Sequence, residues 1–387
     1  MRNVALLFLC EAWTRTSSIV VLSSMALIGR ALTPAPGLAT LPLAIIPVTT
    51  LLCTVPAARL MQKKGRRIGF ASGACLGVIG GSLCSLALWQ QDFTMLCFGA
   101  SFIGAVNGFA TYYRFAGGEV VSETLRSRAI SMVMAGGIVA AFAGSNIATI
   151  SREIIGPHLF IGTYIAVALL QTLVFFTVIW VKFPNSGNTV IEGRGRPLKI
   201  IARQPEFILA VVGAVTSGFV MSLLMNTTPL SMDRHMHSFD DTAWVIQWHI
   251  LGMYAPAFFT GHLINRFGIT KVMSVGILIL FASVLTNLGG TQLSYYLIGL
   301  TLLGLGWNFL FIGSTTLLAK SHSANEKANV QSANDSLIYG LLIITTFGSG
   351  PLENTLGWYK INLITLPLLV GAGLTMYFLS KKIRPIE

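Results

Sequence analysis

Residues 58–67 read ARLMQKKGRR, and residues 261–271 read GHLINRFGITK. The two stretches share a leucine, a basic residue and a glycine at matching positions, 203 residues apart. Each lies between two long apolar runs, so each is interpreted as a short, positively charged turn between hydrophobic helices. A turn of this kind that recurs later in the same chain indicates a duplicated unit.

Two further pairs of segments repeat in the same order. Residues 103–109 (IGAVNGF) match residues 303–309 (LGLGWNF) at a spacing of 200. Residues 126–129 (RSRA) correspond loosely to residues 325–328 (NEKA) at a spacing of 199. Three landmarks at a nearly constant spacing predict two related halves.

The composition places these halves in a membrane. Hydrophobic residues make up 53% of the 387 residues and charged residues only 10%, and the mean hydropathy is +0.72. Soluble domains carry about 25% charged residues, so a soluble enzyme and a disordered chain are excluded. The net charge of +12 arises from 26 basic and 14 acidic residues, too few for a nucleic-acid-binding surface.

Long apolar runs predict an all-α integral membrane protein. A transmembrane helix needs roughly 20 mostly apolar residues, whereas a membrane β-barrel shows strands of about ten residues with alternating polarity. The runs are too long and too uniformly apolar for a barrel. Twelve of them meet the helix criterion: 4–29, 37–61, 67–89, 93–121, 127–151, 157–182, 205–231, 242–264, 269–289, 292–318, 327–352 and 357–380.

The basic residues predict the orientation. With both termini in the cytoplasm, 19 of the 26 Lys and Arg residues lie on the cytoplasmic side. The outer side then holds four: Arg30, Arg152, Arg234 and Lys360. This asymmetry follows the positive-inside rule, and it accounts for the excess positive charge.

The longest loop divides the chain. We expect an N-terminal six-helix bundle over 1–182, a cytoplasmic linker over 183–204 and a C-terminal six-helix bundle over 205–387. The linker contains glycine, proline, asparagine and several basic residues, and it separates spans six and seven. The expected fold is therefore two pseudo-symmetric six-helix bundles with 12 transmembrane helices.

At this point the chain resembles the major facilitator superfamily along essentially its whole length. That family carries the loop signature G-x-L-x-D-R-x-G-R-R/K between spans two and three, and a weaker copy between spans eight and nine. Here Gln62 and Asn265 replace the signature's acid, which departs from its charge-relay pattern. The resemblance assigns gating or loop roles to Lys63, Gly65, Arg66, Arg67, Arg126, Arg128, Gly261, Asn265, Arg266 and Gly268.

Ionisable residues inside spans are costly and are therefore functional candidates. Glu11 and Arg15 lie one turn apart on span one, and Arg114 on span four has about the same depth as Glu11, about 10–12 Å. Glu11 is thus expected to pair with Arg114, either as a structural lock or as part of a transport site. Tyr112 and Tyr113, beside Arg114, are either cavity-lining or packing residues.

In the second half, Asp335 is the only acid in the core of the spans. It is either a proton site or a hydrogen-bonded acid near the cytoplasmic entrance, and Asn334 is its neighbour. Trp307 and Asn308 on span ten complete the expected substrate and proton pathway. Asp233, Arg234, His235 and His237 lie in an outer loop that we interpret as solvated, so no metal site is expected.

These features predict a secondary transporter in the bacterial inner membrane that moves a small, possibly anionic molecule by alternating access. No nucleotide-binding motif is present, so proton coupling through Glu11 or Asp335 is the proposed energy source. Import and efflux both remain open. We expect no cofactor, no enzymatic activity and a monomer, with the lipid bilayer, a small-molecule substrate and protons as partners. The alternative is a non-transporting sensor with a transporter-like fold.

Overall fold

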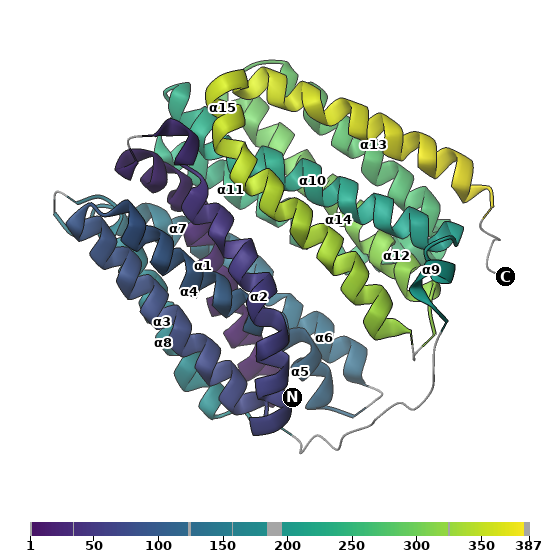
Figure 1. The fold of residues 1–387 in the computed structure, drawn as a ribbon, viewed down its shortest axis with the longest axis horizontal. Helices are drawn as coiled ribbons and strands as arrows, with labels where there is room; N and C mark the ends of the chain where they lie inside the picture. The colour runs from purple at the N-terminus through teal and green to yellow at the C-terminus, as the bar shows by residue number, and fades with distance from the viewer. Residues whose placement is uncertain are drawn as a thin grey trace. The chain divides into compact units, whose positions relative to one another are not determined.

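The structure, a computed structural model, describes residues 2–33, 35–122, 125–156, 158–183, 196–323 and 326–382. Every regular element in this part of the chain is a helix, as drawn in Figure 1. The elements are α1 (Arg2–Leu32), η1 (Pro36–Leu38), α2 (Leu41–Lys64), α3 (Arg66–Gln90), α4 (Phe93–Ala110), α5 (Tyr113–Glu119), α6 (Arg126–Met134), α7 (Gly136–Ser151), α8 (Ile161–Ile179), α9 (Leu198–Ile201), α10 (Pro205–Arg234), α11 (Phe239–Tyr254), α12 (Ala257–Phe267), α13 (Ile269–Leu288), α14 (Leu293–Lys320) and α15 (Lys327–Ser380).

Ten stretches of these helices are long and apolar enough to cross a membrane. The α15 stretch contains two crossings, because Gly357 has φ 71° and ψ 173° and reverses the chain between them. The eighth span is divided between α11 and α12. Neither helix is long enough by itself to be counted among the ten. The twelve-helix, all-α fold is therefore confirmed.

Three predicted spans are interrupted in the structure, and one of them, the run 127–151, is divided at Ala135 between α6 and α7. The run 242–264 is broken between α11 and α12, where Pro256 has no N–H to continue the helix. The run 93–121 is broken at Thr111 and Tyr112, where the Tyr112 N–H bonds to the Phe109 carbonyl three residues back. The break at Pro256 could be expected from the proline in the sequence, whereas the break at Thr111 and Tyr112 has no such signal.

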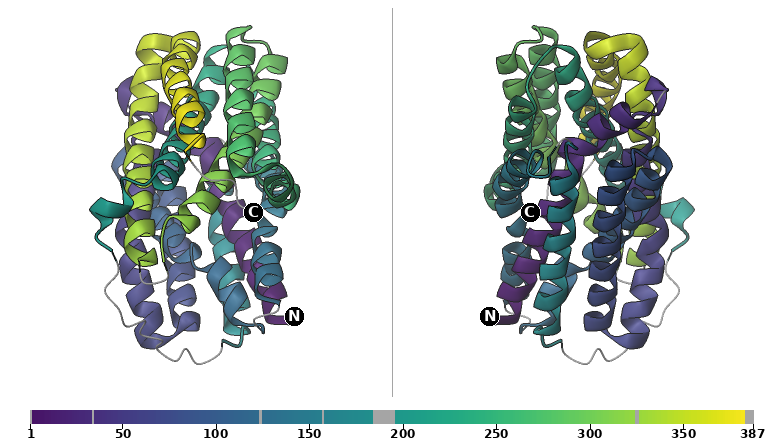
Figure 2. Two further views of the ribbon diagram at one scale, coloured as in Figure 1. Left: turned by 90° about the vertical axis from the view of Figure 1, so that its right-hand side faces the viewer. Right: turned by 90° about the vertical axis from the view of Figure 1, so that its left-hand side faces the viewer.

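The chain folds into two compact units. The first comprises Met1–Asn188 together with Ser238–Gln247, and the second comprises Thr189–His237 together with Trp248–Glu387. In the first unit α1 packs against α7, and α3 packs against α4 and α8. In the second, α10 packs against α15, and α13 packs against α14 and α15. Within each unit these helices run alongside one another in both views of Figure 2.

The packing repeats the duplication seen in the sequence. Gly65 and Gly268, in the two copies of the charged turn, adopt φ/ψ of 88°/158° and 92°/152°. A positive φ of this size suits glycine because it has no Cβ. Gly104 and Gly304 both lie too close to a neighbouring helix for a side chain, against Ile46 and Thr49 in one unit and against the His249 carbonyl in the other.

Candidate functional site

Glu11 and Arg15 form an ion pair along α1. Arg15 Nε donates to Glu11 Oε1 at 2.7 Å. Glu11 is only 6% exposed, and its second oxygen, Oε2, is buried without a hydrogen-bond partner among the described residues. A carboxylate in this position has one oxygen neutralised by arginine and one that can carry a proton.

The expected pair between Glu11 and Arg114 is not formed in the described part of the chain. Arg114 lies on an exposed face of α5, and its guanidinium carbon sits over the Phe115 ring, 4.7 Å from the centroid. The depth argument predicted a height for Arg114 in the bilayer but not the direction of its side chain around the helix axis. Arg15, four residues from Glu11 on the same helix, supplies the partner instead.

The two tyrosines beside Arg114 have different surroundings. Tyr113 is 2% exposed and stacks on Phe70 with ring centroids 4.4 Å apart, inside an apolar cluster. Tyr112 is partly exposed, and its hydroxyl donates to the Thr54 carbonyl at 3.1 Å. Tyr113 therefore packs within the first unit, and Tyr112 links α2 to the break in span four.

A small polar cavity of about 10 Å³ lies among α1, α3, α4 and α8, on the first unit. Ser18 Oγ donates to Asn107 Oδ1 at 3.2 Å, and Gln171 Nε2 donates to Ser17 Oγ at 3.1 Å. Gln171 Oε1 is buried and without a partner among the described residues. A cavity of this size and polarity suits one water molecule.

The first charged turn is anchored to α5. Arg66 forms a two-bond ion pair with Glu119, and its guanidinium also lies 5.6 Å from the Tyr112 ring centroid. Arg67 Nη2 donates to the Val181 carbonyl at 2.9 Å, while Lys63 is exposed. The side chains of Arg126 and Arg128, to which the resemblance assigns gating or loop roles, lie outside the described residues.

The second charged turn has the same backbone but lacks the anchor. Arg266 lies over the Phe267 ring at 5.3 Å, and no described carboxylate pairs with it. Asn265, Gly261 and Gly268 are exposed. The two copies of the loop motif therefore differ in their electrostatics.

Asn308 bridges the break in span eight. Its Nδ2 donates to the Met253 carbonyl at 2.6 Å, and its Oδ1 accepts from Thr260 Oγ1 at 2.7 Å. Asn308 is 1% exposed, so its amide connects the end of α11 to α12. Trp307, its neighbour, is partly exposed and stacks on Phe311 with ring centroids 4.7 Å apart.

Asp335 is exposed on α15, and its Oδ1 accepts from Asn334 Nδ2 at 3.2 Å. Asn334 is 7% exposed. Asp335 thus differs from Glu11, which is buried.

Sequence reasoning missed a buried polar cluster between α10 and α15, formed by Ser222, Asn226, Thr345 and Thr346. Asn226 Nδ2 donates to Ser222 Oγ at 3.1 Å and to Thr346 Oγ1 at 2.9 Å, and Thr345 Oγ1 donates to Ser222 Oγ at 2.8 Å. All four residues are at most 6% exposed. The sequence does contain a signal for this cluster, namely uncharged polar residues within otherwise apolar spans. A search restricted to charged residues does not find them.

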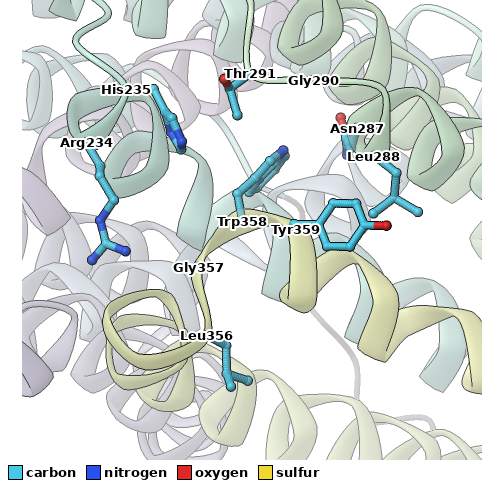
Figure 3. Close-up of a pocket in the computed structure, with 10 residues that line it drawn as sticks. All are labelled: Arg234, His235, Asn287, Leu288, Gly290, Thr291, Leu356, Gly357, Trp358 and Tyr359. Atoms are coloured by element: carbon cyan, nitrogen blue, oxygen red, sulfur yellow. The ribbon is translucent and has the colours of Figure 1, made fainter.

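The end of α10 lies beside a pocket of about 220 Å³ in the second unit (Figure 3). Arg234 donates to the Glu353 carbonyl and pairs with the Glu353 carboxylate, both at 3.1 Å. His237 Nε2 lies 2.7 Å from the Thr291 carbonyl. The loop interpreted as solvated is thus partly bonded to its neighbours. In the described part of the chain, no three His, Cys, Asp or Glu side chains gather as metal ligands would.

The end of the predicted linker is fastened to the second unit. Arg196 Nε donates to Glu326 Oε1 at 2.7 Å and Nη2 donates to Oε2 at 2.8 Å. The Ser323 N–H also donates to Glu326. The Arg196 hydrogen bonds, followed by those from the backbone N–H groups, hold the pKa of Glu326 well below its usual value.

These features define a polytopic membrane protein with two structurally related units and polar groups buried inside its spans. The model of the Major Facilitator Superfamily matches residues 4–346. The chain belongs to this superfamily, and it is a transporter.

Curated relatives support the same conclusion. The chain is 35% identical to the riboflavin transporter RfnT of Brucella anthropi over 370 residues, which cover 95% of this chain and 93% of the relative. It is 27% identical to the uncharacterised transporter YdeG of Bacillus subtilis, with 81% of this chain and 76% of that protein covered.

Solved structures agree with the fold. A bacterial homologue of the human lysosomal transporter Spinster, in its inward-facing and unoccupied conformation, aligns with a TM-score of 0.70 at 14% identity, with 98% and 96% of the two chains covered. An auto-inhibited peptide transporter of the POT family aligns with a TM-score of 0.69 at 12% identity, with 100% and 98% covered. At these identities the likeness concerns the fold alone.

Proposed function

We propose that this chain imports riboflavin, or a closely related flavin, across the bacterial inner membrane. The observation that carries the proposal is the 35% identity to a riboflavin transporter across 95% of the chain. The alignment extends over both halves and therefore includes the helices that line the transport path in this superfamily.

The uncharged polar groups support a neutral, hydroxyl-rich substrate. The cluster of Ser222, Asn226, Thr345 and Thr346 places hydroxyl and amide groups without a net charge inside the spans of the second unit. A riboflavin side chain carries several hydroxyls and no charge, which suits such groups. We also infer that the two halves act as the moving bodies of an alternating-access cycle, with both termini in the cytoplasm.

A small organic anion is the second candidate substrate. It is favoured by Arg114, whose guanidinium faces an aromatic ring and has no carboxylate partner among the described residues. Such an arginine would attract a phosphate or carboxylate.

Uptake into liposomes separates the two candidates. Purified protein is reconstituted, and uptake of riboflavin is compared with uptake of riboflavin 5′-phosphate, which adds only a charged group. We expect riboflavin to be taken up and the phosphate to compete poorly. Efficient uptake of the phosphate that is lost in Arg114→Gln would favour the anion, and uptake of neither compound would refute the flavin proposal.

Coupling to protons is part of the proposal. Glu11 is the preferred proton site because it is buried and one of its oxygens has no partner among the described residues, whereas Asp335 is exposed. A proton on Glu11 would release Arg15 from the pair, and deprotonation would restore it. Each cycle of protonation thus changes the charge at this point of α1.

A further inference from the structure

The pocket beside the end of α10 has two aromatic side chains, Trp358 and Tyr359, in its lining. It is bounded by the ends of α10 and α13, by the connection that leads into α14, and by the turn at Gly357 (Figure 3). Trp358 is 3% exposed, and its ring is held 5.0 Å from that of Tyr296. Tyr359, which is 58% exposed, lies at the rim. The volume of about 220 Å³ is below that of most drug-sized sites, so it fits a small fused ring rather than a whole large ligand.

Arg234 supplies hydrogen-bond donors to this pocket. A guanidinium has five N–H groups, and the two described bonds of Arg234 both go to Glu353. Its side chain is 35% exposed, so further N–H groups remain available to a ligand. The Glu353 carboxylate compensates the charge of Arg234, and the pocket therefore does not require an anionic ligand.

His235 supplies an acceptor. Its Nδ1 lies 2.7 Å from the Ser231 carbonyl oxygen, which only accepts, so Nδ1 carries the hydrogen. In the neutral ring Nε2 is then a bare acceptor. None of the described residues hydrogen-bonds Nε2, and His235 is exposed at the pocket.

Arg234 and His235 offer a donor and an acceptor at two separate places in the pocket lining, because the Arg234 guanidinium extends away from the His235 ring (Figure 3). A flat ring with polar groups along its edge could accept from Arg234 through a carbonyl oxygen and donate through an N–H to His235 Nε2. We propose that this pocket is a binding subsite for a heteroaromatic ring that carries C=O and N–H groups along one edge, such as the pyrimidinedione edge of a flavin. The choice of a flavin ring rests on the proposed function, whereas the recognition of a ring amide does not. In the orientation expected from the basic residues, the subsite faces the outside and would receive the ring before translocation.

The test uses two probes that differ in one hydrogen-bond donor. Lumichrome has the flavin-type pyrimidinedione ring without the sugar chain, and N3-methyl-lumichrome lacks the N–H that would donate to His235. Binding to the purified, full-length protein is measured by the quenching of probe fluorescence. We expect lumichrome to bind about three- to tenfold more tightly than its methyl analogue, as one hydrogen bond predicts.

Variants assign this preference to the pocket. In His235→Phe both probes are expected to bind equally weakly, whereas the matched control His262→Phe, on the exposed face of α12, should keep the preference. Leu288→Trp enlarges a side chain on the opposite side of the pocket from His235 (Figure 3) and should remove the preference as well. Equal binding of the two probes to the wild-type protein, or a preference that survives in both pocket variants, would overturn the proposal.

The subsite and the proposed function can fail separately. Riboflavin uptake by a wild-type protein that shows no probe preference would leave the transport proposal standing and refute the subsite. A preference that depends on His235, in a protein that takes up no flavin, would support the subsite and refute the transport of flavins.

Discussion

The guanidinium of Arg66 binds both carboxylate oxygens of Glu119, with Nη2–Oε1 at 2.6 Å and Nε–Oε2 at 3.1 Å. This pair ties the charged turn after α2 to the end of α5. Both side chains are less than one-third exposed, so the pair is partly shielded from water. In the second copy of the turn Ile269 stands at the position of Arg66. Arg266, the counterpart of Lys63, lies over the Phe267 ring.

Glu119→Gln should therefore destabilise the protein. Loss of a partly buried, two-bond ion pair is expected to lower the free energy of unfolding by about 1–2 kcal/mol, which a thermal-unfolding measurement in detergent detects. Arg266→Gln, which removes the guanidinium from the second copy of the turn, is the control and should change stability little. Equal melting temperatures for Glu119→Gln and the wild-type protein would contradict the anchoring role of Arg66.

The Arg196–Glu326 pair should show a pH dependence of known sign. The folded-state pKa of Glu326 lies below its ordinary value of 4.5. Its stabilising contribution is therefore complete above about pH 4.5 and disappears as the pH falls through the folded-state pKa.

Wild-type protein and Glu326→Gln should accordingly differ in melting temperature at neutral pH and converge in acid. At neutral pH the variant should also be cleaved faster by trypsin after Arg196 and Lys199, because the linker end is released. Glu206→Gln, in the first turn of α10, is the control. A difference in melting temperature that persists unchanged at low pH would argue against the ion pair as its source.

Glu11→Gln should uncouple transport from the proton gradient. A glutamine keeps the size of the side chain but cannot exchange a proton, so uptake into liposomes should no longer respond to an imposed pH difference. Asp335→Asn alone is expected to retain the response. The control Glu153→Gln changes an acid that is 63% exposed and should behave as wild type. A Glu11→Gln/Asp335→Asn double variant with the wild-type pH response would exclude both acids as coupling sites.

Asn308→Leu should destabilise span eight. The substitution leaves the Met253 carbonyl without its described side-chain donor and removes the acceptor of Thr260. A buried polar group that loses its partner costs about 1–3 kcal/mol, so a clearly lower melting temperature is expected. Asn265→Leu, at an exposed site, serves as the comparison. A thermal stability like that of wild type in Asn308→Leu would show that the bridge is dispensable.

Much of the fold could be read from the sequence because a bilayer permits few solutions. Backbone groups in hydrocarbon must be hydrogen-bonded within the segment, so each long apolar run becomes a helix. The break at Pro256 also has a local cause. The break at Thr111 and Tyr112 has none in the sequence, since it arises from a tight turn that the surrounding packing holds in place.

The side-chain contacts of the candidate site were harder to predict from the sequence than the fold. The i,i+4 spacing placed Glu11 and Arg15 on one helical face, but the prediction paired Glu11 with Arg114 instead. The partners of Arg114, Glu119 and Asn308 depend on which face each helix turns toward its neighbours. The sequence gives the expected depth of a residue in the bilayer, but it does not give the direction in which the side chain points from the helix axis.

The sequence by itself determined the class of the protein, the number of crossings, the duplicated charged turns and the short list of charges within spans. Each of these follows from local composition and from the thickness of the bilayer. Only the tertiary structure decided that Glu11 bonds to Arg15 and not to Arg114, that Arg66 holds Glu119, and that Arg234 and His235 border a pocket. These relationships depend on helix rotation and packing, which are set by contacts among residues far apart in the chain.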